Sequence, residues 1–301
     1  MRRSRTQAWS AEALVVAAIA TAIWFPGAQG QADHRVLRNI EYANVDGVSL
    51  RLDLYLPKRP NAPVPLVLWV HGGAWRAGDK APTRAPGTLG DAYAVASVNY
   101  RLSDEALFPA QIHDVKAAVR FLRGNADRFG LDPDRFGAWG SSAGGHLVAL
   151  LGTSCGVPEL EGDLGDHLDR SSCVQAVCDF FGPTDFSTLL EQRGEETRRP
   201  MPEDQLIGGS VEENVELATS ASPAAYIDAT DPPFLIMHGS DDPTVPVQQS
   251  IAFHEALLLA GIESTLVLIE GAAHGFPPTE FGPVRPFFDQ HLLDDSSNPT
   301  G

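Results

Sequence analysis

The chain has 301 residues, of which 43% are hydrophobic and 20% are charged, a composition typical of a globular protein with a sizeable core. Its 22 Lys and Arg against 39 Asp and Glu give a formal net charge of −17. This charge, without any basic block, excludes nucleic acid as an expected partner because it would repel phosphate. It also predicts a soluble surface with weak affinity for anionic membranes.

Residues 1–30 have the pattern of a secretory signal peptide. Three arginines precede an apolar run of eleven residues from Leu14 to Trp24, and small residues stand at positions 28 and 30. A helix that spans a bilayer needs about 20 residues, so we expect no integral membrane segment in the mature chain. The expected mature protein is residues 31–301, secreted or periplasmic and folded as a single domain.

Three cysteines follow in the mature chain. Cys178 lies inside an apolar run that is typical of a buried strand, and we expect it to be a small core residue. Cys155 and Cys173 flank a polar loop, and export would allow them to form a disulfide. The alternative is three free thiols. The spacing does not fit a zinc site.

The mature chain begins with a predicted β-hairpin. Val36–Val45 and Ser49–Leu56 are two strand-like runs around the turn residues Asp46 and Gly47. We expect this hairpin to form the antiparallel edge of a larger sheet.

Further along, short apolar runs alternate with segments of helical periodicity. The expected strands are Pro65–Val70, Tyr93–Val98, Phe136–Trp139, Val174–Phe180, Phe234–Met237 and Thr265–Ile269. The expected helices begin near Pro109, near Ala143, near Ile251 and near Phe287, and the third of them ends at Gly261. This alternation predicts an α/β fold: a mostly parallel central sheet of about eight strands with helices on both faces.

One segment breaks the alternation. Gly182–Asp231 separates two predicted strands by fifty residues and holds eleven acidic and three basic side chains. It has too few apolar residues for a core of its own. We therefore expect an insertion that covers the substrate site rather than a second domain.

Gly140-Ser141-Ser142-Ala143-Gly144 fits the pattern G-x-S-x-G between a predicted strand and a predicted helix. A nucleophile elbow needs a serine on such a tight strand-to-helix turn, with glycines where side chains would clash. The helix N-terminus offers backbone N–H groups to a developing oxyanion. Ser142 is the predicted nucleophile.

His71-Gly72-Gly73-Ala74-Trp75 follows the first expected buried strand. The two glycines let the backbone approach a substrate closely, and acyl transfer needs donors aimed at the tetrahedral oxygen. The segment resembles the HGGG-type loop, which makes the N–H groups of Gly73 and Ala74 the expected oxyanion donors, together with that of Ala143. His71 is expected to organise the loop rather than act as a base.

A serine nucleophile needs a base, and the base needs an orienting acid. His274 follows the last expected strand in a small-residue loop, and Asp242 follows the strand before it. Ser142 also stands beyond the carboxyl end of a parallel strand, so all three are expected at one edge of the sheet. Asp241 is the alternative acid, but Asp242 precedes Pro243 in the pattern H-G-x-x-D-x-x-V-P. His238 is expected to be structural.

Together these residues resemble the α/β-hydrolase superfamily, and most closely the feruloyl-esterase-like and carboxylesterase group related to hormone-sensitive-lipase-type esterases. The matching stretches are HGGAWRAGDK (71–80), NYRL (99–102), DPDRFGAWGSSAGG (132–145), DFFGPTD (179–185), HGSDDPTVP (238–246) and GAAHGF (271–276). The resemblance implies a serine carboxylic-ester hydrolase that needs no metal or organic cofactor. Together with the signal pattern of residues 1–30, the hypothesis is a secreted esterase.

The sequence leaves several substrates and reaction classes open. Trp75 and the insertion are expected to set substrate size, and an acidic insertion favours neutral short-chain or aryl esters over anionic ones. An arylformamidase or a peptidase would use the same three residues on an amide. A non-catalytic binding protein would not need all three.

Overall fold

In a computed structural model, residues 34–58, 60, 63–194 and 200–293 are described. They form one sheet of eight strands in the order β1-β2-β4-β3-β5-β6-β7-β8. The strands are β1 His34–Val45, β2 Val48–Pro57, β3 Val64–Val70, β4 Ala94–Val98, β5 Leu131–Ser141, β6 Ala176–Phe180, β7 Phe234–Gly239 and β8 Ser264–Ile269. From β4 to β8 neighbouring strands are parallel, and β2 joins β4 antiparallel.

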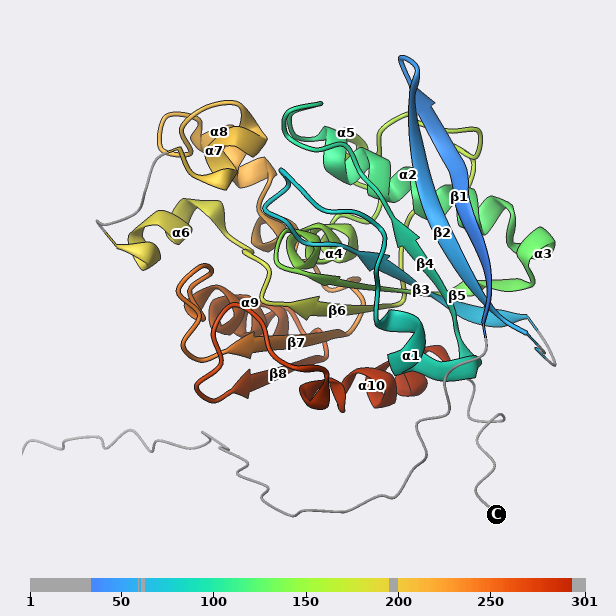
Figure 1. The fold of residues 1–301 in the computed structure, drawn as a ribbon. Helices are drawn as coiled ribbons and strands as arrows, with labels where there is room; N and C mark the ends of the chain where they lie inside the picture. The colour runs from blue at the N-terminus through green and yellow to red at the C-terminus, as the bar shows by residue number, and fades with distance from the viewer. Residues whose placement is uncertain (1–33, 59, 61–62, 195–199, 294–301) are drawn as a thin grey trace, which may run out of the picture. The chain divides into compact units, whose positions relative to one another are not determined.

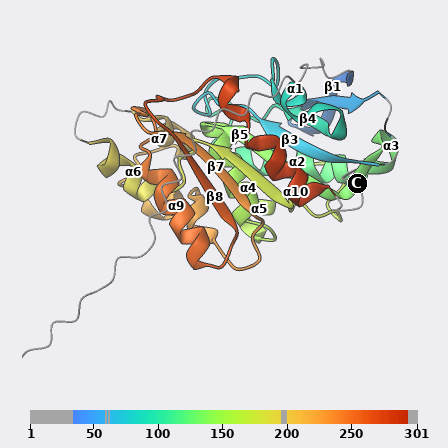
Figure 2. The same ribbon diagram turned by 90° about the horizontal axis from the view of Figure 1, so that it is seen from below.

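Helices cover both faces of the sheet (Figures 1 and 2). The α-helices are α1 Ala85–Leu89, α2 Ala110–Gly124, α3 Ala126–Phe129, α4 Ala143–Thr153, α5 Pro158–Glu161, α6 Phe186–Arg193, α7 Pro202–Ile207, α8 Val215–Ser220, α9 Gln248–Leu259 and α10 Val284–Leu292. Short 3₁₀ turns are η1 Gly90–Ala92, η2 Pro223–Tyr226 and η3 Pro278–Phe281. One core joins the sheet to α2, α4 and α9, and another joins it to α1 and α10.

The opening hairpin and the sheet follow the sequence pattern. Asp46 and Gly47 both have positive φ, 51° and 89°, which suits a two-residue hairpin turn. The inner strands β4, β6 and β7 are buried along their whole length, as continuous apolar runs predict. The expected α/β fold with a mostly parallel sheet is confirmed.

The start of β5 differs from the expectation. β5 begins five residues earlier than predicted, at Leu131, because Leu131 pairs with Val64 of β3 although Pro133 follows it. Leu258 is 50% exposed whereas Leu257 is fully buried. Adjacent helix positions point in directions about 100° apart, so α9 turns only one of these two leucines to the sheet.

The insertion, residues 182–231, holds α6, α7, α8 and η2. Its buried Phe186, Leu206 and Ala218 belong to the same core as α2 and α4. Arg193 of α6 donates two hydrogen bonds of 2.9 Å to the buried carboxylate of Glu203 in α7. The pair joins two helices of the insertion, and the described residues of the insertion pack on the core of the main domain rather than around a core of their own.

The predicted signal segment, residues 1–30, lies outside the described residues. Among those that are described, no helix is long and apolar enough to cross a membrane.

The predicted cysteine pair is confirmed. Cys155 and Cys173 form a disulfide with their Cα atoms 5.1 Å apart, and Cys178 is a buried free thiol. The disulfide closes a loop at the end of α4. Inside the loop, Glu161 accepts hydrogen bonds from Lys116 and from Ser172, so a partly buried ion pair and a covalent bond fix the same segment.

We expect replacement of both Cys155 and Cys173 by Ser to lower the free energy of unfolding by about 3 kcal/mol. The two cysteines are 18 residues apart, and a disulfide that closes a loop of this length lowers the conformational entropy of the unfolded chain by about that amount. Urea unfolding with and without dithiothreitol measures it. The reductant should destabilise the wild type and leave the double variant unchanged. Equal urea midpoints for all four samples would contradict the prediction.

Candidate active site

Ser142 lies on the turn between β5 and α4 with φ 55° and ψ −122°, a conformation that non-glycine residues rarely adopt. Two close approaches make this turn possible. A Cβ atom at Gly140 would lie 2.2 Å from the carbonyl oxygen of Gly144, and one at Gly144 would lie 2.1 Å from that of Val70. The glycines of G-x-S-x-G are therefore required by packing, and the turn projects Ser142 beyond the strand.

His274 connects Ser142 to Asp242. His274 Nε2 lies 2.9 Å from Ser142 Oγ, and His274 Nδ1 lies 2.7 Å from Asp242 Oδ2. A carboxylate can only accept, so Nδ1 carries the hydrogen and Nε2 is free to accept the serine proton. The three residues therefore lie together at one edge of the sheet, as predicted. They follow β5, β7 and β8.

Asp242 is held as a carboxylate. Burial opposes its ionisation, but hydrogen bonds from His238, from His274 and from the backbone N–H groups of Val245 and Thr244 outweigh that cost and lower the pKa of Asp242 well below its ordinary value. The alternative acid, Asp241, is exposed and accepts a hydrogen bond from Ser240 Oγ at 3.2 Å. Of the two acids, Asp242 is the one that contacts His274.

His238 has a contact that sequence reasoning missed. Its ring is fully buried. Its Nε2 atom lies 2.9 Å from the carbonyl oxygen of Val245 and 3.2 Å from Asp242 Oδ2. Its Nδ1 lies 2.6 Å from Ser250 Oγ. Two histidines thus reach the same carboxylate oxygen. The first residue of the H-G-x-x-D-x-x-V-P pattern was the available signal for this contact.

The glycine-rich loop after β3 runs beside the nucleophile. A Cβ atom at Gly72 would lie 2.7 Å from Ser141 O and 3.2 Å from Ser142 Cβ. Gly73, Ala74 and Trp75 all have positive φ, 116°, 55° and 57°. Ala143, whose N–H has no intrahelical acceptor, begins α4 directly after Ser142. The three backbone donors predicted from sequence therefore belong to two segments that meet at Ser142.

The side chains of this loop point inward. Trp75 is 2% exposed, and its Nε1 donates to His146 Nδ1 at 3.2 Å. The expected substrate-facing tryptophan ring is thus packed between α4 and the insertion. His71 stacks on Tyr100 with ring centroids 4.5 Å apart, and its Nδ1 lies 2.8 Å from Gly72 O. Burial lowers the pKa of His71, which fits its expected role of organising the loop.

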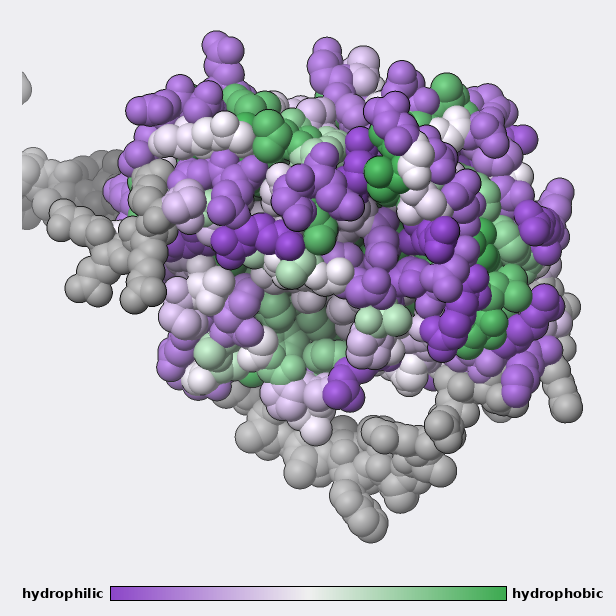
Figure 3. All heavy atoms as spheres, turned by 45° about the horizontal axis from the view of Figure 1, so that its top comes forward, coloured by the Kyte–Doolittle hydropathy of each residue, from purple (hydrophilic) through white to green (hydrophobic). Residues whose placement is uncertain are grey.

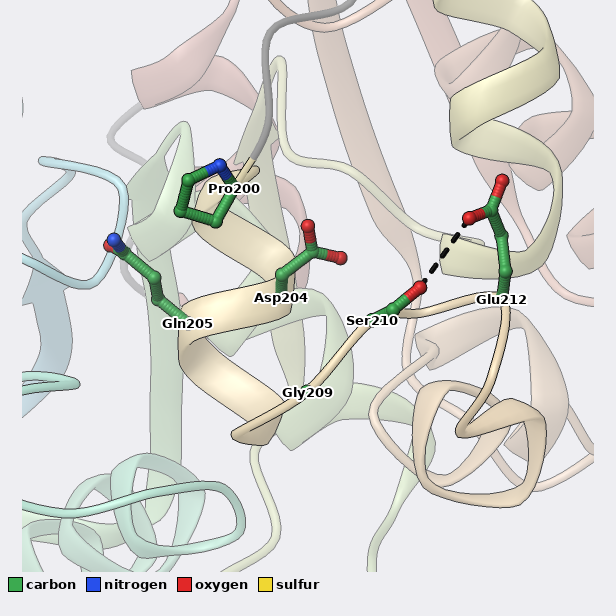
Figure 4. A pocket seen from close by; sticks show the side chains of 6 residues that line it. All are labelled: Pro200, Asp204, Gln205, Gly209, Ser210 and Glu212. Atoms are coloured by element: carbon green, nitrogen blue, oxygen red, sulfur yellow. Dashed lines mark hydrogen bonds between the residues drawn. The ribbon is translucent and has the colours of Figure 1, made fainter.

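A hollow of about 520 Å³ lies on the insertion beside this loop. Pro200, Asp204, Gln205, Gly209, Ser210 and Glu212 line it (Figure 4). Gln205 accepts a hydrogen bond of 3.3 Å from Arg76, the residue after Trp75. The molecular face in Figure 3 is largely hydrophilic, with hydrophobic side chains in separate patches. Across the described part of the chain, no group of three or more His, Cys, Asp or Glu side chains is arranged to hold a metal ion.

An eight-stranded sheet of this order, with a strained serine turn and a Ser-His-Asp arrangement beyond its strands, defines an α/β-hydrolase. Comparison with known proteins agrees. The BD-FAE family model matches residues 52–257. A truncated carbohydrate esterase from gut microbiota is 33% identical with a TM-score of 0.81, and the match covers 88% of this chain and 99% of that one.

The chain belongs to the BD-FAE family, and its described domain is that of a carboxylic ester hydrolase. Esterase 2 of Thermogutta terrifontis, solved with propionate bound, is 29% identical with a TM-score of 0.65 over 88% of this chain and 93% of that one. Esterase LipC of Mycobacterium tuberculosis is 32% identical over 80% of this chain. The chain spans 59% of LipC and 51% of Esterase LipQ, so it covers about half the length of these curated relatives.

The lowered pKa of Asp242 predicts a pH-dependent stability. A carboxyl with a lowered folded-state pKa stabilises the fold above its unfolded pKa of about 3.9, and this contribution is lost as the pH falls toward the folded value. Relative to Asp242→Asn, the wild type should therefore lose up to about 1.4 kcal/mol per pH unit below about pH 4. Urea unfolding between pH 5 and 2.5 measures this difference.

Asp241→Asn is the matched control, because that carboxylate is exposed and one position away. Its unfolding free energy should follow the wild type at every pH. Parallel pH curves for the wild type and Asp242→Asn would contradict the assignment of Asp242 as the stabilised carboxylate.

Proposed function

We propose that the protein is a serine carboxylic-ester hydrolase that acts on neutral short-chain or aryl esters through an acyl-enzyme. The observation that best supports this is the pair of hydrogen bonds that join Ser142 to His274 and His274 to Asp242, at 2.9 Å and 2.7 Å. These are the distances at which a serine proton can pass to an imidazole that a carboxylate orients.

In the proposed reaction, Ser142 Oγ attacks the ester carbonyl carbon while His274 Nε2 takes the serine proton. The C–O bond to the alcohol breaks, and His274 returns the proton to the leaving alkoxide. Water then attacks the acyl-enzyme with His274 again as base, which releases the acid and restores Ser142. The N–H groups of Gly73, Ala74 and Ala143 would hold the oxyanion in both halves. No step requires a metal or an organic cofactor.

Two observations bear on the substrate. The relatives include a protein described as a carbohydrate esterase and an esterase solved with propionate, which favours small acyl groups. The insertion has eleven acidic and three basic side chains, which disfavours anionic substrates by repulsion. A neutral short-chain ester, free or carried on a polymer, satisfies both.

We also propose that the mature protein is exported. Residues 1–30 have the signal pattern, and the Cys155–Cys173 disulfide is typical of an oxidising compartment. Expression of the full chain in a bacterial host should yield a periplasmic or medium fraction whose mass lacks about the first thirty residues. Recovery of only unprocessed chain in the cytoplasm would contradict export.

Replacement of Ser142 by Ala should lower kcat on p-nitrophenyl acetate by at least about 10³-fold, because it removes the attacking oxygen. The neighbouring serine supplies the matched control. Ser141→Ala should keep more than a tenth of the wild-type kcat, because the hydroxyl bonded to His274 is that of Ser142. The reverse outcome would reassign the nucleophile.

A substrate panel separates the reaction classes. Initial rates of residues 31–301 would be measured on p-nitrophenyl acetate, p-nitrophenyl octanoate, methyl ferulate and N-formylkynurenine. Hydrolysis of acetate or ferulate that Ser142→Ala abolishes supports the esterase. Cleavage of the formamide alone would replace it with an amide hydrolase, and no turnover by folded protein would leave a binding role.

A further inference from the structure

The loop proposed to carry two oxyanion donors is strained at consecutive positions. Ala74 and Trp75 have φ of 55° and 57°, values that side chains other than glycine disfavour. A return of Ala74 to ordinary φ would rotate its peptide plane and turn its N–H away from the oxygen of the carbonyl group that Ser142 attacks. Something in the surrounding structure must therefore hold the loop in place.

Trp75 is held from two sides. Its carbonyl oxygen accepts hydrogen bonds from the N–H and the hydroxyl of Ser103, at 2.8 Å and 2.9 Å. Its indole Nε1 donates to His146 Nδ1 at 3.2 Å. The indole also meets the rings of His146 and Phe186 edge-on, with centroids 5.1 Å and 5.7 Å away. The buried side chain therefore anchors the loop to the core.

His146 is in the one tautomer that this contact needs. Its Nε2 lies 2.7 Å from the carbonyl oxygen of Ala221, which can only accept, so Nε2 carries the hydrogen. Nδ1 then has a free lone pair for the indole N–H, which can only donate. The ring is fully buried and stacks on Phe186, and burial lowers its pKa to about 4, so it is neutral at neutral pH.

The partners of His146 come from three segments around Ser142. The residue itself stands four positions after Ser142, and its own N–H donates to Ser142 O at 2.9 Å. Trp75 belongs to the glycine-rich loop. Ala221 and Phe186 belong to the insertion. One imidazole therefore bridges the nucleophile helix, the donor loop and the segment that covers the site.

We propose that His146 is a positioning residue, which holds the oxyanion loop in its strained conformation through the indole of Trp75. This rests on the proposed function, because the N–H groups it positions are the proposed donors. It also assigns Trp75 a role in fixing the loop in place of the substrate contact expected from sequence. Neither side chain needs to touch the substrate.

The test is a pair of variants that keep an aromatic ring and remove the hydrogen bond. His146→Phe removes the acceptor, and Trp75→Phe removes the donor. With p-nitrophenyl acetate we expect each to lower kcat about 10- to 100-fold, the range for a small displacement of catalytic groups, with KM changed less than about 2-fold. A trifluoromethyl ketone, which forms an oxyanion on the serine, should lose affinity by the same factor as kcat.

Three controls make the result specific. Phe253→Leu truncates a buried ring that packs on Phe234 and not on the Trp75–His146 pair, so it should lower the melting temperature and leave kcat within about 3-fold. His146→Gln, which keeps a donor and an acceptor, should recover part of the lost kcat. The double variant His146→Phe/Trp75→Phe should be no worse than the poorer single variant, because both remove the same bond.

Wild-type kcat and ketone affinity in folded His146→Phe and Trp75→Phe would overturn the proposal. So would additive losses in the double variant, or a loss confined to KM. If His146→Phe does not fold, Trp75→Phe decides alone, since it removes the same bond from the other side. Failure of the proposed function looks different: the wild type itself would not turn over any ester in a Ser142-dependent way.

Discussion

The whole site depends on one close contact: the backbone of the turn at Ser142 packs against the end of β3 with no room for a side chain at Gly144 or Gly72. This contact brings the serine turn and the glycine-rich loop together, because the two segments follow the neighbouring strands β5 and β3. The order of the strands in the sheet then places the acid and the base. β7 and β8 deliver Asp242 and His274 to the same edge of the sheet, so the fold brings together residues that lie up to 132 positions apart.

Strain and burial support each other in this arrangement. Ser142 and Phe181 both have positive φ, and both are tied to neighbouring strands, since Ser142 N donates to Phe180 O and Phe181 N donates to Met237 O. Conformations that would relax in isolation are thus fixed by sheet hydrogen bonds. Phe181 also packs its ring 4.8 Å from that of His274. The apolar contact limits the orientations open to the imidazole without competing for its nitrogens.

Sequence alone predicted the parts of this site that local pattern determines. The buried strands, the serine turn and the order Ser142, Asp242, His274 follow from apolar runs and short motifs, because each is decided within about ten residues. Side-chain direction was not accessible in the same way. Trp75 stands in a glycine-rich loop, which gives no sign that its side chain is buried. Its indole points into the core because it bonds His146, which is 71 positions away. The second histidine on Asp242 stands only four positions before it; the motif contained it, but a motif does not give the direction of its side chain.

The insertion contacts the loop that carries the proposed oxyanion donors on two sides. Arg76 binds Gln205 of α7 at 3.3 Å on the outside, while Trp75 reaches Phe186 and, through His146, Ala221 on the inside. Two successive loop residues, Trp75 and Arg76, therefore contact the insertion that is expected to cover the substrate site. We therefore expect sequence changes in the insertion, residues 182–231, to act also on the backbone of the loop that carries the proposed oxyanion donors. On the proposed function, substrate selection by the insertion and turnover at the donor loop would be coupled through the side chains of Trp75 and Arg76.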